Sequence, residues 1–117
     1  MARMRLFAGL TLGMVVALVL ASTAQAAYMA SRTLYGTDSG SISTVQCAAD
    51  IWSNASLDAA ATSEHSGSGC ASVSVKIYYY NPAGYAGWSG TVTHPYYAQK
   101  ALGGSDELQR SYHTAVR

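Results

Sequence analysis

The clearest pattern in the sequence is an alternation of apolar and polar residues within positions 72–93. Val73, Val75 and Ile77 recur at every second position, with serine or lysine between them, which is the period of a strand with one buried face. Residues 81–84, Asn-Pro-Ala-Gly, have the chemistry of a type I turn. A second alternation follows this turn, so the segment predicts a β-hairpin.

The register of this hairpin has two solutions. Apolar pairing favours a register in which Tyr80 lies opposite Tyr85. A three-residue loop that ends with Gly84 in a left-handed conformation shifts the pairing by one residue and places Tyr78 across from Trp88. A bulge at one of the later glycines would then restore apolar pairing farther along the hairpin.

Shorter segments predict further strands. Residues 27–35 and 108–116 alternate in the same way and predict a first and a last strand, although the charges near the start of the second segment also fit a helical turn. Residues 36–40 and 63–69 are rich in glycine, serine and aspartate, so turns are expected there.

The alanine-rich and serine-rich stretch between these turns is ambiguous. Its apolar residues fit a short helix over 44–53, and they fit strands interrupted near Asn54 almost equally well, with a strand over 54–62. Short strands separated by Gly, Ser and Pro turns favour a mainly β fold, a small antiparallel β-sandwich or meander, with this one short helix as an open alternative.

The first 26 residues have the three parts of a secretory signal peptide. Two arginines precede an uncharged apolar run over 6–20, and small residues at Ala24 and Ala26 follow. The run is shorter than the roughly 20 residues that cross a bilayer. We therefore expect cleavage after Ala26, release of 27–117 as a single small β-rich domain, and a secreted product without a membrane anchor.

Removal of the signal peptide changes the composition. The first 26 residues are richer in apolar residues than the rest of the chain, and residues 27–117 contain only 12 Leu, Ile and Val against 21 Ser and Thr. The same residues carry five Lys or Arg and six Asp or Glu, a formal charge of −1. A nearly neutral domain lacks the basic surface that nucleic acids or anionic membranes require, so neither is an expected partner.

Two cysteines, Cys47 and Cys70, remain after cleavage. An exported protein meets oxidising conditions, so this even pair predicts a disulfide. The closed loop would stabilise the fold by about 3 kcal/mol in the chain-entropy model.

Candidate chemistry is sparse. His65, His94 and His113 lack the spacing of a zinc site, so no metal, cofactor or catalytic residue is predicted. Residues 38–41, Asp-Ser-Gly-Ser, resemble the Asp-Thr/Ser-Gly signature of aspartic proteases, which implies paired aspartates that activate water. In that family the signature follows an apolar strand, whereas in this sequence Gly36 and Thr37 come directly before Asp38. A turn is therefore the preferred interpretation, and a small hydrolase is the least favoured function.

Tyrosine is the unusual component, with nine residues, all after position 26. If Tyr79 points to the core, then Tyr78, Tyr80 and Tyr85 share the opposite face of the hairpin, and such rigid rings favour a binding surface. The alternative is that tyrosines build a core that is poor in aliphatic residues. The sequence thus predicts a monomeric, non-enzymatic module that binds an extracellular or cell-envelope partner, with a secreted antimicrobial or toxin-like factor as the alternative.

Overall fold

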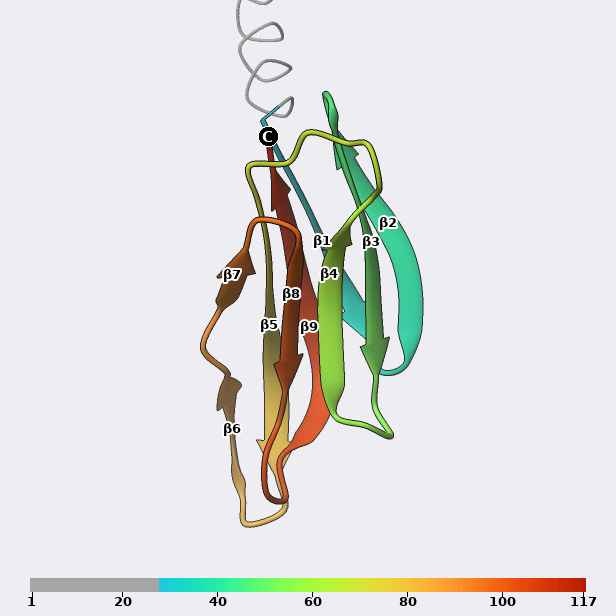
Figure 1. The fold of residues 1–117 in the computed structure, drawn as a ribbon. Helices are drawn as coiled ribbons and strands as arrows, with labels where there is room; N and C mark the ends of the chain where they lie inside the picture. Colours follow the sequence, from blue (N-terminus) through green and yellow to red (C-terminus); the bar gives the residue numbers. More distant parts are fainter. Residues whose placement is uncertain (1–27) are drawn as a thin grey trace, which may run out of the picture.

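A computed structural model describes residues 28–117, which form nine strands in two antiparallel sheets packed face to face (Figure 1). The predicted mainly β sandwich is confirmed. The predicted signal peptide and the cleavage after Ala26 lie outside the described residues.

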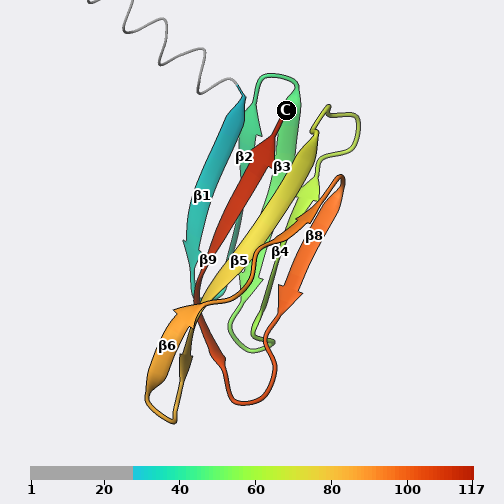
Figure 2. The same ribbon diagram turned by 90° about the vertical axis from the view of Figure 1, so that its left-hand side faces the viewer.

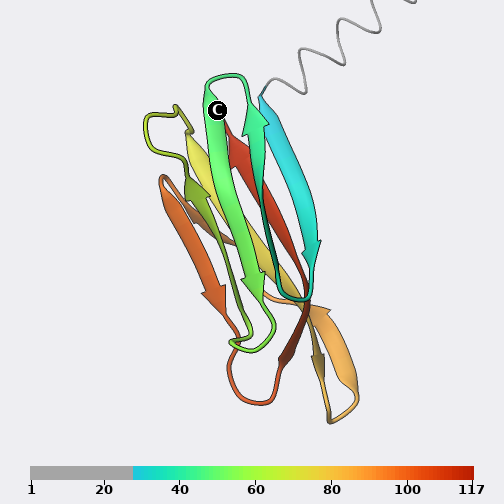
Figure 3. The same cartoon turned by 90° about the vertical axis from the view of Figure 1, so that its right-hand side faces the viewer.

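Sheet A has the order β1-β9-β5-β6, and β7 also pairs with β5. Its strands are β1 (Met29–Tyr35), β9 (Glu107–Val116), β5 (Ser72–Asn81), β6 (Tyr85–Trp88) and β7 (Val92–His94). Sheet B has the order β2-β3-β4-β8. Its strands are β2 (Asp38–Thr44), β3 (Cys47–Asn54), β4 (Ala59–Glu64) and β8 (Tyr97–Ala101). Figure 2 looks onto sheet A, and Figure 3 looks onto sheet B from the opposite side.

The short helix over 44–53 was a wrong alternative, because β3 occupies most of that stretch. Residues along β3 are buried at every second position, with Cys47, Ala49 and Ile51 facing the other sheet. Small residues on both faces of β3 hide this period of two in the sequence. Pairing with β2 and β4 on its two sides fixes the strand.

Two other boundaries differ from the prediction, and one strand was not predicted. The expected turn over 36–40 is shorter, because β2 already begins at Asp38. The strand expected over 54–62 is displaced to β4, and Asp58, with a φ of 49°, ends the turn before it. The sequence left β8 without an assignment, since its five residues mix apolar and polar types without a clear period.

The hairpin of β5 and β6 adopts the register with the three-residue loop. Asn81 pairs with Tyr85, Tyr78 pairs with Trp88, and Gly84 has a φ of 105°. The pairing then shifts by one residue before β7, where Val75 lies opposite Val92. Apolar pairing is therefore restored farther along, as expected for a later bulge, although with a different partner for Val92.

The interior is built from aliphatic side chains, alanines and five buried polar residues: Ser53, Thr62, Asn81, Ser111 and His113. Val73, Val75 and Ile77 of β5 are buried against sheet B. The expectation that tyrosines build this core is wrong: no Tyr or Trp of the described residues is fully buried, and Tyr79 only packs against its border. Runs of alanine, as in β4, fill the space instead, because small side chains let the two sheets approach closely.

The predicted disulfide between Cys47 and Cys70 is confirmed. Cys47 opens β3 in sheet B, and Cys70 lies just before β5 in sheet A. The bond therefore ties the two sheets together at one end of the sandwich.

Candidate functional site

The strand register of sheet A places rings and cations side by side on the face that points away from the core. Tyr35 of β1 pairs with Arg110 of β9, Arg110 pairs with Tyr78 of β5, and Tyr78 pairs with Trp88 of β6. These four side chains form a row across four strands, on the sheet that faces the viewer in Figure 2.

A second row lies next to the first along the strands. Thr33 pairs with Tyr112, and Tyr112 pairs with Lys76. We call six residues of the two rows the cation–aromatic cluster: Tyr35, Lys76, Tyr78, Trp88, Arg110 and Tyr112.

Two irregularities in the sheet assemble this cluster. Tyr78 pairs with Arg110 while Tyr79 pairs with Leu108, so Gln109 is a bulge in β9. On a regular strand, two residues that are two positions apart share a face. The bulge changes this, so that Leu108 faces the core and Arg110 faces outward. The three-residue loop of the hairpin supplies the other irregularity, since it places Trp88 directly opposite Tyr78.

Ring contacts hold both cations in place. The Lys76 Nζ lies 4.6 Å from the centre of the Trp88 ring and 5.4 Å from that of Tyr112. The Arg110 Cζ lies 4.5 Å from the centre of the Tyr78 ring and 5.3 Å from that of Trp88. The Tyr78 and Trp88 rings meet edge to face at 5.3 Å. Cation–π attraction of this kind orients a side chain without neutralising its charge.

The charges of Lys76 and Arg110 are not balanced by a carboxylate. Among residues 28–117, the one ion pair joins His65 to Asp50, away from the cluster, and neither Lys76 nor Arg110 donates a side-chain hydrogen bond. Glu107, which pairs with Tyr80, is the acidic residue of β9 and forms no such bond with them. The cluster is thus locally cationic on a nearly neutral chain.

An open pocket of about 300 Å³ lies on the cluster, lined by Thr33, Tyr35, Lys76, Trp88, Arg110 and Tyr112. Its lining residues carry a guanidinium, an ammonium, an indole N–H and three hydroxyls, so the pocket offers mainly hydrogen-bond donors. Such a pocket can bind an anion or an acceptor-rich polar molecule, while the rings offer flat apolar surfaces beside it.

The observed register does not bring the three tyrosines of the predicted binding face, Tyr78, Tyr80 and Tyr85, onto the same face of the sheet. Tyr78 and Tyr80 lie on the outer face of sheet A, but the expected placement of Tyr85 beside them is wrong. The three-residue loop pairs Tyr85 with Asn81, so its ring meets that of Tyr79 at 6.5 Å on the other face. A binding role for these tyrosines stays a prediction.

Sequence reasoning missed most of the cluster. Lys76 is a charged residue in the middle of the most regular strand, and it could have indicated a functional position on the outer face of β5. Tyr35, Arg110 and Tyr112 belong to β1 and β9, and no local pattern links these strands to the hairpin.

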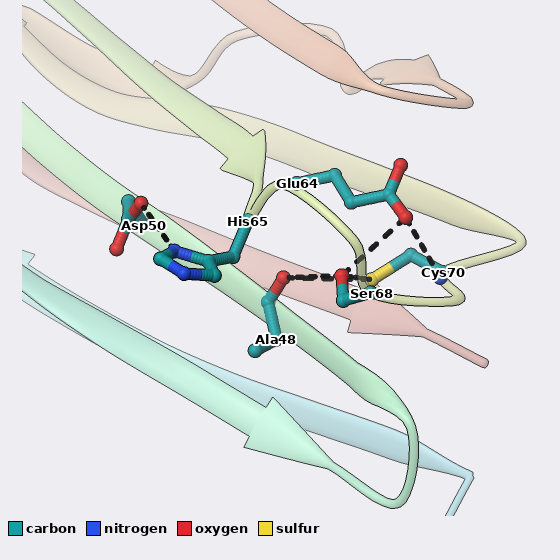
Figure 4. A network of polar contacts seen from close by, with 6 residues as sticks. All are labelled: Ala48, Asp50, Glu64, His65, Ser68 and Cys70. Carbon is teal, nitrogen blue, oxygen red and sulfur yellow. Dashed lines mark hydrogen bonds and ion pairs between the residues drawn. The ribbon is translucent and has the colours of Figure 1, made fainter.

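A second hollow, of about 540 Å³, lies beside the disulfide and is lined by Thr44, Gln46, Cys47, Ala48, Gly67, Ser68 and Gly69. The loop around it satisfies its own polar groups (Figure 4). The Glu64 carboxylate accepts a hydrogen bond from the Cys70 N–H at 3.1 Å, and the Ser68 hydroxyl donates to the Ala48 carbonyl at 3.0 Å. These contacts give the loop a structural role in holding Cys70 near β3.

The histidines and Asp38 lie apart from the cluster. His65 lies 3.2 Å from Asp50, and the His94 imidazole accepts hydrogen bonds from two backbone N–H groups of the following turn. His113 is fully buried between the sheets, and burial lowers its pKa from 6.5 to about 4. Asp38 is exposed and accepts a hydrogen bond from the Ser39 N–H. Within the described part of the chain, no three metal-ligating side chains come together.

Comparison with known proteins finds no matching family model, no matching curated protein and no matching solved structure. Over residues 28–117 there is no helix with the length and apolar character to span a membrane.

Proposed function

We propose that the protein is an exported, non-enzymatic module that binds an extracellular or cell-envelope component on its cation–aromatic cluster. The observation that carries this proposal is the pair of unneutralised cations, Lys76 and Arg110, framed by four rings on one face of sheet A. Charged groups without a partner retain hydrogen-bonding capacity for a ligand.

The scaffold under the cluster favours binding. β5 and β9 are both flanked by other strands, so their backbones are held on two sides. The ring contacts already fix the positions of Lys76 and Arg110. A preorganised surface of this kind loses little conformational entropy when it binds a ligand, so more of the interaction free energy contributes to affinity.

The disulfide supports export. Disulfides persist in oxidising environments, and the Cys47–Cys70 bond is compatible with an extracellular protein. The predicted signal peptide agrees with that location.

A binding assay with matched variants tests the proposed function. The full chain is expressed with its N-terminal segment, recovered in oxidised form, and mixed with cellulose, chitin, peptidoglycan, dextran and polygalacturonate. Trp88→Ala should lose the binding that the unmodified protein shows. Tyr97→Ala is the control, because Tyr97 is 43% exposed on the outer face of sheet B and Trp88 is 41% exposed on sheet A. Equal loss in both variants, or equal retention in both, would refute the cluster as the binding surface.

A further inference from the structure

Resting on the proposed function, we infer that the ligand of the cation–aromatic cluster is an acidic polysaccharide, and that one anionic sugar occupies the pocket beside Lys76 and Arg110. The acidic group can be a carboxylate or a sulfate, since both present the same oxygen acceptors to a guanidinium and an ammonium.

The charge of the pocket selects an anion. A guanidinium that lies over a ring keeps five N–H donors in its own plane, and a carboxylate or sulfate can accept two of them. The Arg110 Cζ lies 4.5 Å from the centre of the Tyr78 ring, and Lys76, in the neighbouring row, adds a second cation. No carboxylate of the described residues lies within ion-pair distance of either group. The ligand therefore supplies the missing negative charge.

The surroundings of the pocket suit a sugar. Residues Trp88 and Tyr35 are 41% and 68% exposed, so each can offer apolar ring surface to the C–H face of a sugar ring. Beyond the row of Thr33, Tyr112 and Lys76, the next row of the same face consists of hydroxyl side chains: Ser31, Thr114, Ser74 and Thr93. Successive rows on one face lie about 6.6 Å apart. A polysaccharide that leaves the pocket toward this row meets hydrogen-bonding partners for its own hydroxyls.

The position of the cluster within the sheet disfavours an acidic peptide. Peptides that bind sheets pair their backbone with an exposed edge strand. The cluster is centred on β5 and β9, whose backbones already pair with strands on both sides, so only side chains are presented there. A nucleic acid is disfavoured too, because its affinity depends on many phosphate contacts and the cluster holds two cations.

Tryptophan fluorescence gives a readout specific to this face. The chain has two tryptophans, with Trp88 in the cluster and Trp52 on the outer face of sheet B, where it pairs with Ala61. Trp52→Phe leaves Trp88 as the one tryptophan reporter, and Trp88→Phe leaves Trp52. Titration uses polygalacturonate, dextran sulfate, neutral dextran and polyglutamate as the four probes.

We expect the two acidic polysaccharides to change the fluorescence of Trp52→Phe and to leave that of Trp88→Phe unchanged. Arg110→Gln and Lys76→Gln should each weaken binding by about tenfold, the usual scale for loss of one charge-assisted hydrogen bond. Arg117→Gln is the matched control, because Arg117 also lies over a ring, that of Tyr28, outside the cluster. A rise from about 50 to about 500 mM salt should weaken binding as the charges are screened.

The other outcomes distinguish a failure of the acidic-polysaccharide ligand from a failure of the proposed binding function. Equal affinity for neutral dextran and the acidic polysaccharides, reported by Trp88, would overturn the acidic ligand but keep the proposed function. Equal or tighter binding of polyglutamate would assign the cluster to acidic proteins and overturn the sugar. If Arg110→Gln weakens binding no more than Arg117→Gln does, the pocket is not the anion site. Failure of every probe here and in the polysaccharide panel contradicts the proposed function itself.

Discussion

Acidification is expected to destabilise the sandwich through one buried imidazole, that of His113. The Thr62 hydroxyl donates its hydrogen to the Ser74 carbonyl at 2.8 Å, so it accepts a hydrogen bond from the His113 Nδ1–H at 2.8 Å. The His113 Nε2 then accepts a hydrogen bond from the Ser111 hydroxyl at 2.7 Å. This arrangement satisfies the neutral ring. A backbone hydrogen bond to Ala61 favours the protonated ring, but the cost of burying the charged form is larger, so the pKa stays low.

The magnitude follows from the pKa. Burial lowers the pKa of His113 from 6.5 to about 4, whereas the unfolded chain keeps the ordinary value. As the pH falls from about 6.5 to about 4, the unfolded state binds a proton that the folded state does not, so the free energy of unfolding decreases. A difference of about 2.5 between the two pKa values corresponds to about 3 kcal/mol. This contribution is complete above about pH 6.5 and is lost below about pH 4.

Urea unfolding at about pH 7, 5.5 and 4, for the native sequence and for His113→Gln, measures this contribution. The variant should be less stable at pH 7, because it loses the hydrogen bonds of the His113 ring to Thr62 and Ser111. It should lose less stability on acidification, because the neutral amide of Gln cannot titrate. The difference between the two slopes isolates His113 from the carboxylates that also titrate. Parallel pH profiles, or an NMR titration that gives His113 a pKa near 6.5, would refute this reasoning.

Two further changes concern stability. Reduction of the disulfide, or the pair of substitutions Cys47→Ala and Cys70→Ala, should lower the free energy of unfolding by about 3 kcal/mol, because the bond closes a loop with a sequence separation of 23. A loss below about 1 kcal/mol in urea unfolding would contradict this prediction. Gly84→Ala should cost about 1–2 kcal/mol in the same assay because its φ is 105°, whereas Gly90→Ala, which also adds a Cβ in open space without a left-handed φ, should cost less. Equal costs would show that the turn is not strained.

Local patterns in the sequence predict the elements that carry a strong period. The alternation of Val73, Val75 and Ile77 identifies β5 and its buried face correctly, and the two cysteines predict the disulfide. β3 and β8 are less visible, because each carries alanine on both of its faces, which reduces the contrast that a period of two needs.

The cation–aromatic cluster depends on register, which the local sequence determines weakly. Tyr35, Lys76 and Arg110 come from three strands that are distant in the chain, and pairing alone brings them together. The bulge at Gln109 has no glycine to signal it, so the outward position of Arg110 could not be predicted. The hairpin register was open between two solutions because turn chemistry and apolar pairing favour different partners for Trp88.

NMR mapping of polygalacturonate on the isotope-labelled protein locates the binding surface directly. We expect the largest chemical-shift changes at the side-chain N–H groups of Arg110 and Trp88, and smaller ones along the hydroxyl row of Ser74 and Thr114. Changes confined to sheet B, or to the hollow beside the disulfide at residues 44–48 and 67–69, would contradict the cation–aromatic cluster as the site.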